Sequence, residues 1–178
     1  MINHRREDMA KEKDRHRSLK SQMKRVYVFK HPTDFKSHYV AQVYPVRCAD
    51  DRCWKTYDRF LKDNGITKLD PKTPAGAAKV FASPEKPGDR DYNLRELAIS
   101  IRLHKVKTVW LMNHSHCGAY GGIERFGGDE DKEFELHAKE LRKARRVILE
   151  KFPKLKVKIY FIDATGIIEV SPEKKSAK

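Results

Sequence analysis

Three residues that can bind a metal ion occur in two short segments of this 178-residue chain. Cys48 lies in the first segment, and His114 and Cys117 lie in the second, separated by two residues. Zinc prefers thiolate and imidazole ligands in a tetrahedral arrangement. Three protein ligands leave a fourth position open, as in catalytic rather than structural zinc sites. A turn can point His114 and Cys117 at one ion, and Cys48 can join them if its strand lies beside theirs.

Each of these residues also has an ordinary structural interpretation. A single His-x-x-Cys pair is a weak signal, and a lone cysteine is often a small buried apolar residue. The combination is stronger, because Cys48 follows a predicted strand at 39–46 and His114 follows another at 108–112. In parallel sheets, ligands bind at the carboxyl ends of the strands. The two segments are therefore expected at one edge of a sheet.

Strand and helix patterns alternate along the chain. Strands are predicted at 26–29, 39–46, 77–82, 108–112, 157–162 and 167–170, and helices at 54–62, 91–105 and 132–151. This alternation predicts an α/β fold with a mostly parallel central sheet flanked by helices. A glycine-rich loop from Gly118 to Gly128 follows the second metal-binding segment.

Composition divides the chain into one domain with two tails. Residues 1–25 are charged and basic, and we interpret them as either a mobile tail or a helical arm packed on a partner subunit. Residues 26–170 are predicted to form a single α/β zinc-binding domain, and residues 171–178 a disordered tail. The length fits one domain with a substantial core.

The balance of charge limits the classes of partner. The chain has 39 Lys and Arg against 25 Asp and Glu, a net charge of +14. This charge could favour anionic partners or only solubility, and no nucleic-acid motif accompanies it. Neither a membrane-spanning run nor an apolar signal-peptide core is seen. We therefore expect a cytoplasmic protein, in which three cysteines suit metal binding better than disulfides.

The two metal-binding segments together resemble the β-class carbonic anhydrases. The segment from Cys48 to Arg52 matches the Cys-x-Asp-x-Arg motif of that family, and the segment from His114 to Gly118 matches its His-x-x-Cys-Gly motif. The resemblance covers residues 39–122 well and residues 130–170 as a pattern. It implies a β-carbonic-anhydrase-like fold.

The resemblance also implies a site and a reaction. Cys48, His114 and Cys117 would bind Zn²⁺, and Asp50 and Arg52 would form a catalytic pair. Arg52 would hold the carboxylate of Asp50 off the metal, so that Asp50 accepts a hydrogen bond from zinc-bound water. The expected reaction is the reversible hydration of carbon dioxide to bicarbonate by a metal-bound hydroxide. Carbonyl sulfide or carbon disulfide as substrate, and a non-catalytic zinc-stabilised basic module, remain alternatives.

Other residues near the motifs receive structural interpretations. Asp51, with Asp50 as the alternative, is the expected N-cap of the following helix, and Cys53 is expected to be a structural thiol rather than a ligand. His116 could move protons or simply face solvent. His104 and His137 lie in helical patterns and are expected at the surface.

The chain departs from the family at one further motif. Many members carry Arg-Asn-Ala-Gly after their second strand, and the region expected to correspond here is 82–85, which has a different sequence. The segment 74–76 is expected to precede the second strand without replacing that motif. Family members exchange N-terminal helices in dimers, so we expect a homodimer or a higher homo-oligomer.

Overall fold

The computed structural model describes residues 27–171. The chain divides into two units between Ser37 and His38. Every helix and strand that the described residues form belongs to the second unit. The predictions for residues 1–25 and 172–178 concern segments outside the described residues.

The predicted strand at 26–29 is wrong for the described residues 27–29. Val28 and Phe29 form a bend, Tyr27 has no regular structure, and Val28 is fully exposed. A strand forms only where a neighbouring strand accepts its backbone hydrogen bonds, and the β-rich composition of this run does not supply one.

Four strands form one sheet in the order β1-β2-β3-β4. These are β1 (Tyr44–Arg47), β2 (Thr108–His114), β3 (Lys156–Ile162) and β4 (Ile167–Glu169). The first three are parallel, and β4 pairs antiparallel with β3. The predicted mostly parallel sheet is confirmed, although β1 begins later than the expected residue 39.

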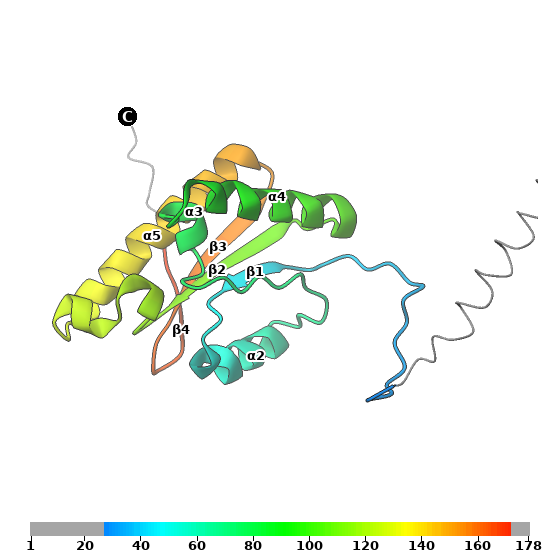
Figure 1. Cartoon of the computed structure of the whole chain (residues 1–178), viewed down its shortest axis with the longest axis horizontal. Coiled ribbons are helices and arrows are strands. Elements are labelled where there is room, and N and C mark those ends of the chain that lie inside the picture. The colour runs from blue at the N-terminus through cyan, green and yellow to red at the C-terminus, as the bar shows by residue number, and fades with distance from the viewer. Residues whose placement is uncertain (1–26, 172–178) are drawn as a thin grey trace, which may run out of the picture. The chain divides into compact units, whose positions relative to one another are not determined.

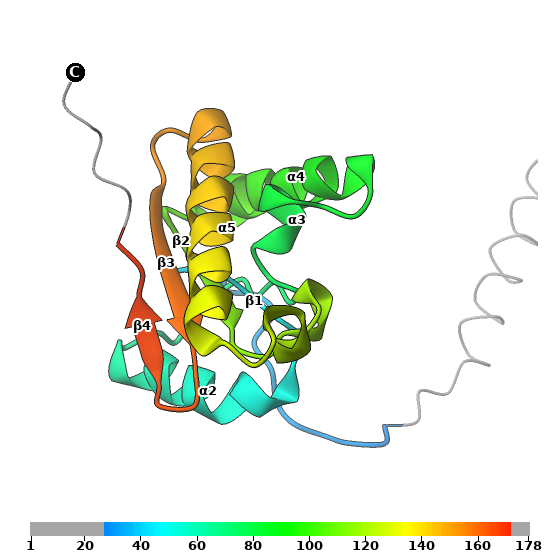
Figure 2. The ribbon, with the colours of Figure 1, turned by 90° about the vertical axis from the view of Figure 1, so that its left-hand side faces the viewer.

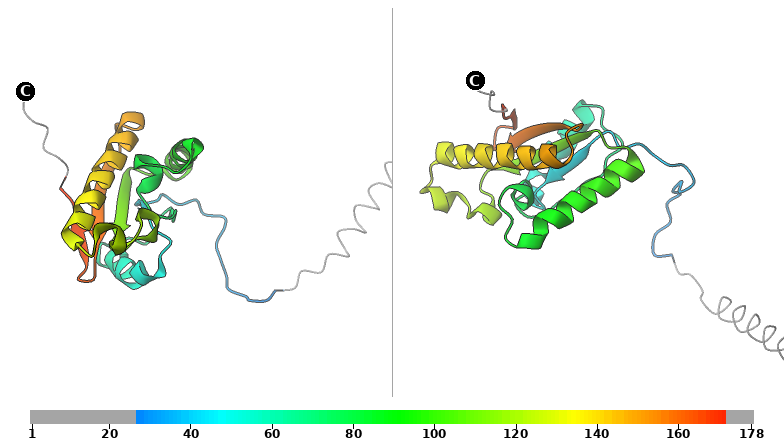
Figure 3. Two further views of the ribbon diagram at one scale, coloured as in Figure 1. Left: turned by 60° about the vertical axis from the view of Figure 1, so that its left-hand side comes forward. Right: turned by 90° about the horizontal axis from the view of Figure 1, so that it is seen from above.

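Helices cover both faces of this sheet (Figures 1 and 2). The described chain contains α2 (Trp54–Asp63), α3 (Lys79–Ala82), α4 (Pro87–His104) and α5 (Glu130–Lys151). The views in Figure 3 place α3, α4 and α5 on one face of the sheet and α2 on the other. None of the helices within residues 27–171 is both long and apolar enough to span a membrane.

The alternation of side chains along β2 separates two apolar clusters. Val109 and Leu111 pack into the cluster that includes residues of α3, α4 and α5. Trp110 and Met112 point the other way and pack with Tyr57 of α2. Because successive strand residues face opposite sides, one strand anchors both layers. The strand that ends in His114 is thus buried on both faces.

The predicted strand at 77–82 is wrong, because this segment contains the short helix α3. The backbone N–H of Phe81 and that of Ala82 both donate to the carbonyl of Ala78, which closes a helical turn. A short apolar run is compatible with either a strand or a buried helix. Here the segment packs against α5 as a helix.

A segment before α3 makes two isolated bridges beside β1. Val43 makes a parallel bridge to Leu69, and Val46 makes one to Lys72. Residues 69–72 therefore run beside β1, on the side away from β2. The chain then turns directly toward the carboxyl end of β1, which places the segment 74–76 close to Cys48.

Candidate metal centre

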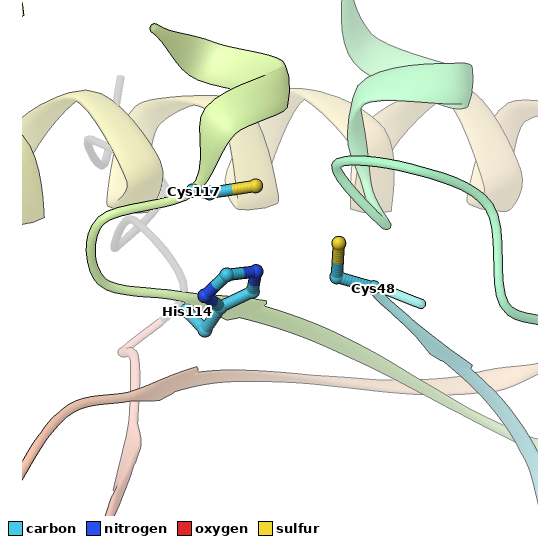
Figure 4. A group of neighbouring side chains, drawn as sticks. All are labelled: Cys48, His114 and Cys117. Atoms are coloured by element: carbon cyan, nitrogen blue, oxygen red, sulfur yellow. The ribbon is translucent and has the colours of Figure 1, made fainter. Parts of the chain in front are cut away.

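Cys48, His114 and Cys117 come together at the carboxyl edge of the sheet. Cys48 follows the last residue of β1, and His114 is the last residue of β2. One ligand atom from each residue lies within 4.8 Å of the other two. Figure 4 shows both sulfur atoms and the imidazole ring directed toward a common point. The structure therefore brings together the three residues that were predicted as ligands.

The turn after β2 carries Cys117 back toward His114. The N–H of Ser115 donates to the carbonyl of Ile162 at 2.9 Å, which extends the pairing of β2 with β3. His116 then adopts a left-handed conformation with φ of 56°. This reversal brings the next residue, Cys117, back over the end of the strand. The His-x-x-Cys spacing matches one such turn.

The imidazole of His114 presents one nitrogen to the site. Its Nδ1 lies 2.8 Å from the carbonyl oxygen of Ser115, which can only accept, so Nδ1 carries the hydrogen. Nε2 is left with a lone pair. That nitrogen is buried and has no hydrogen-bond partner. A buried lone pair without a donor is costly, and a metal ion would satisfy it.

The two thiols share one negative charge. The contact with Cys117 lowers the pKa of the Cys48 thiol below its ordinary value, and the N–H of Gly76 acts in the same direction. The neighbouring Cys48 sulfur in turn raises the pKa of the Cys117 thiol above its ordinary value. A second thiolate needs a compensating positive charge, and a divalent ion would supply it. The donor set therefore fits a metal such as zinc.

Asp50 and Arg52 form a bidentate ion pair beside these three residues. Nε of Arg52 lies 2.9 Å from Oδ1 of Asp50, and Nη2 lies 2.6 Å from Oδ2. The guanidinium lowers the pKa of Asp50 to about 2. The carboxylate is therefore charged and has a fixed orientation at neutral pH.

The ion pair also contacts the metal-binding segment. Oδ2 of Asp50 lies 3.9 Å from Nε2 of His114. Nη2 of Arg52 donates to the carbonyl of His116 at 3.1 Å. Arg52 thus holds the carboxylate next to the cluster while leaving it separate from the three ligand atoms.

The expected cap at Asp51 is wrong. Asp50 is the N-cap of the short 3₁₀ turn Asp51–Cys53, and its side chain accepts from the N–H of Arg52 at 3.0 Å. Asp51 is instead the exposed first residue of that turn. One carboxylate therefore both caps the turn and pairs with the arginine, which explains the two-residue spacing.

Gly76 is a site residue that the sequence prediction missed. Its N–H donates to Sγ of Cys48 at 3.4 Å. The sequence analysis placed the counterpart of the family's Arg-Asn-Ala-Gly motif at 82–85 and not at 74–76, whereas in the structure it is the segment 74–76 that contacts Cys48. This chain has an Ala-Gly pair at 75–76, as the family motif Arg-Asn-Ala-Gly does. That pair could have indicated that Gly76 lies at the site.

The structure agrees with only some of the positions predicted for the neighbouring cysteine and histidines. Cys53 lies outside the ligand cluster found among the described residues, as expected. His116 is exposed. His137 is fully buried, so its predicted surface position is wrong, and His104 is largely covered through a contact with Asp70 at 2.8 Å. His137 and His104 both lie on covered faces of their helices, and each has one ring nitrogen beside a polar group, Asn113 for His137 and Asp70 for His104.

The comparison with a family model agrees with this geometry. A model described as “Putative carbonic anhydrase” matches residues 36–171. The chain belongs to this family. Among relatives of this family member, an uncharacterized protein of Rickettsia bellii (strain RML369-C) is 30% identical over 135 residues, which span 74% of the chain and 82% of the relative. An uncharacterized protein of Rickettsia conorii is 30% identical over 128 residues, which span 70% of the chain and 68% of the relative.

Solved structures resemble this carbonic anhydrase family member in fold. The β-carbonic anhydrase isoform I of Trichomonas vaginalis matches with a TM-score of 0.51 and 12% identity, over 94% of this chain and 98% of that one. The β-carbonic anhydrase CafA of Aspergillus fumigatus matches with a TM-score of 0.56 and 14% identity, over 98% and 90%. The predicted β-carbonic-anhydrase-like fold is confirmed.

Proposed function

We propose that this protein binds one zinc ion through Cys48, His114 and Cys117 and catalyses the reversible hydration of carbon dioxide. The observation that carries the proposal is the unpartnered, buried Nε2 of His114, which lies with two sulfur atoms in a cluster only 4.8 Å across. The paired Asp50 and Arg52 beside this cluster favour a catalytic site over a structural one. Membership in the carbonic anhydrase family supports the same reaction.

Each residue of the site has a distinct task in this proposal. A zinc ion held here would supply hydroxide near neutral pH, an effect for which carbonic anhydrase is itself the standard example. Asp50, fixed beside the cluster by Arg52, would accept a hydrogen bond from a water molecule there and so orient it. Arg52 neutralises Asp50 and keeps its carboxylate from becoming a fourth ligand.

The same proposal extends to the setting of the protein. Cys48, Cys53 and Cys117 are all free thiols, which is compatible with a reducing cytoplasm. Tyr27, Val28 and Phe29 expose apolar side chains, which supports a homodimer or larger homo-oligomer. Light scattering of the full chain tests this, and a strict monomer would contradict the oligomer.

A stopped-flow assay of carbon dioxide hydration tests the proposed reaction. Zinc-loaded protein is expected to accelerate hydration well above the buffer rate, and Cys48→Ser is expected to abolish that acceleration. Carbonyl sulfide and carbon disulfide are assayed in parallel. Activity on these two alone would replace the proposed substrate, and a zinc-loaded protein inactive on all three would refute the enzymatic proposal.

A further inference from the structure

Glu133 is a buried carboxylate that contacts the metal-binding segment from another part of the chain. It lies in the first turn of α5, and only 1% of its surface is exposed. Its Oε1 accepts a hydrogen bond from the N–H of His116 at 2.7 Å. Burying a charged carboxylate is unfavourable unless hydrogen bonds compensate it. The hydrogen bond from His116 therefore offsets part of the cost of burying the Glu133 carboxylate.

The peptide that Glu133 contacts is the one that reverses the chain between the ligands. His116 has a positive φ of 56°, a backbone conformation that residues other than glycine rarely adopt. Its N–H points into the protein and needs an acceptor there. A charged carboxylate is a stronger acceptor than a neutral carbonyl. Glu133 thus stabilises the turn that returns Cys117 to His114.

The same residue connects Glu133 with the catalytic pair. The carbonyl of His116 accepts from Nη2 of Arg52 at 3.1 Å, and Arg52 in turn holds Asp50. The N–H of His116 therefore donates to the buried carboxylate of Glu133, and its carbonyl accepts from Arg52. Arg52 in turn pairs with the carboxylate of Asp50. A shift of this one residue would move both a ligand and the orientation of Arg52.

A second buried contact fixes the environment of Glu133. Oδ1 of Asn113 accepts from the N–H of Ala78 at 3.1 Å, so the amide nitrogen of Asn113 faces His137. That nitrogen lies 3.1 Å from Nδ1 of His137, which must therefore accept. Nε2 of His137 then carries the hydrogen and lies 3.8 Å from Oε1 of Glu133, which is too far for a hydrogen bond, so this N–H acts on Glu133 only as a dipole. The N–H dipole favours the negative charge of Glu133.

We propose that Glu133 is a positioning residue of the metal centre, which acts through the backbone of His116 to hold Cys117 and Arg52 in their working geometry. The inference rests on the proposed zinc site and assigns no contact between Glu133 and substrate. It predicts that the charge of Glu133, and not only its volume, sets the affinity and symmetry of the metal site.

The test compares Glu133→Gln and Glu133→Ala with the matched control Glu135→Gln, which alters an exposed glutamate of the same helix. Zinc affinity is measured by competition with a chelator, and the site geometry by the electronic spectrum of the cobalt(II)-loaded full chain. Glu133→Gln is expected to weaken zinc binding about tenfold, and Glu133→Ala up to about a hundredfold. Both should alter the cobalt spectrum, while Glu135→Gln should change neither.

Thermal unfolding of the metal-free variants separates positioning from general stability. Wild-type zinc affinity and an unchanged cobalt spectrum in Glu133→Gln would overturn the proposal, whether or not Glu133→Ala folds. A variant with a lower unfolding temperature but an unchanged cobalt spectrum would also overturn it. If the wild type binds zinc but hydrates no carbon dioxide, only the proposed function fails. A wild type that binds no zinc or cobalt refutes both.

Discussion

The backbone N–H of Gly76 donates to Sγ of Cys48 across 3.4 Å, although 28 residues separate them. Gly76 has a positive φ of 72°, and a Cβ there would lie 3.0 Å from Cβ of Ala119. A side chain would therefore strain the backbone and press on the loop that follows Cys117. The glycine is needed for its conformation, for the close approach and for its N–H.

We expect Gly76→Ala to lower the free energy of unfolding by about 1 to 3 kcal/mol, because alanine is strained at this φ. Zinc affinity should fall as well, because the N–H of residue 76 would move away from Cys48. Urea unfolding and chelator competition measure the two effects. Gly88→Ala is the control, since a Cβ at Gly88 meets no atom within 4 Å and its φ is not positive. Equal effects of the two substitutions would contradict this account.

Metal content distinguishes the three cysteines. Cys48→Ser and Cys117→Ser each remove a sulfur from the cluster, so purified variants should retain far less than one zinc per chain. Cys53→Ser should retain the wild-type zinc content, because Cys53 lies outside the cluster. Elemental analysis after dialysis measures the content. Zinc loss in Cys53→Ser, or full retention in the other two, would show that the ligand set is wrong.

Arg52→Ala should reduce the rate of carbon dioxide hydration by about a hundredfold, within the range typical of lost acid–base assistance. Without the guanidinium, Asp50 is free to approach the metal and occupy its open position. The stopped-flow assay measures the rate, with zinc content determined on the same samples. Asp51→Asn is the control, since Asp51 is an exposed neighbour of the pair. An Arg52→Ala variant with the wild-type rate would exclude the proposed role.

His137 predicts a loss of stability in mild acid. Burial lowers the pKa of His137 from 6.5 to about 4. Between these values the unfolded chain binds a proton that the folded chain does not. Above pH 6.5 His137 is neutral in both states and does not change the stability, whereas the free energy of unfolding decreases as the pH falls from 6.5 toward 4. The loss should be on the order of 3 kcal/mol.

The pH dependence of urea unfolding from pH 7 to pH 4 measures this contribution. His137→Gln keeps an acceptor for Asn113 but cannot titrate, so its stability should fall less steeply in that window. His31→Gln, which alters an exposed histidine, should follow the wild type. A wild-type slope in His137→Gln would show that other groups cause the acid sensitivity.

Much of the metal site could be predicted from the sequence because its determinants are local. Thiolate and imidazole side chains define the ligand chemistry wherever they converge, and the strands before Cys48 and His114 were readable from short apolar runs. The Cys-x-Asp-x-Arg spacing likewise reflects one turn, in which Asp50 caps the N–H of Arg52 and binds its side chain. Such contacts span two residues and need no distant partner.

The missed residues depend on which helix face is buried. Glu133 and His137 share a face of α5 with Leu141, Ala144 and Ile148, at spacings of three and four residues. That periodicity was a usable signal, but charged and titratable side chains are ordinarily assigned to the solvent face. The helical form of α3 was missed for a related reason, since its short apolar run has no period of its own.

The sequence by itself was enough to single out Cys48, His114 and Cys117 as candidate metal ligands, to place Asp50 and Arg52 beside them, and to predict a mostly parallel sheet flanked by helices. Only the tertiary structure decided that Gly76 contacts Cys48 and that Glu133 contacts the residue before Cys117. The physical reason is that ligand identity belongs to individual side chains, whereas burial and hydrogen bonds between distant segments arise from how the sheet and its helices pack.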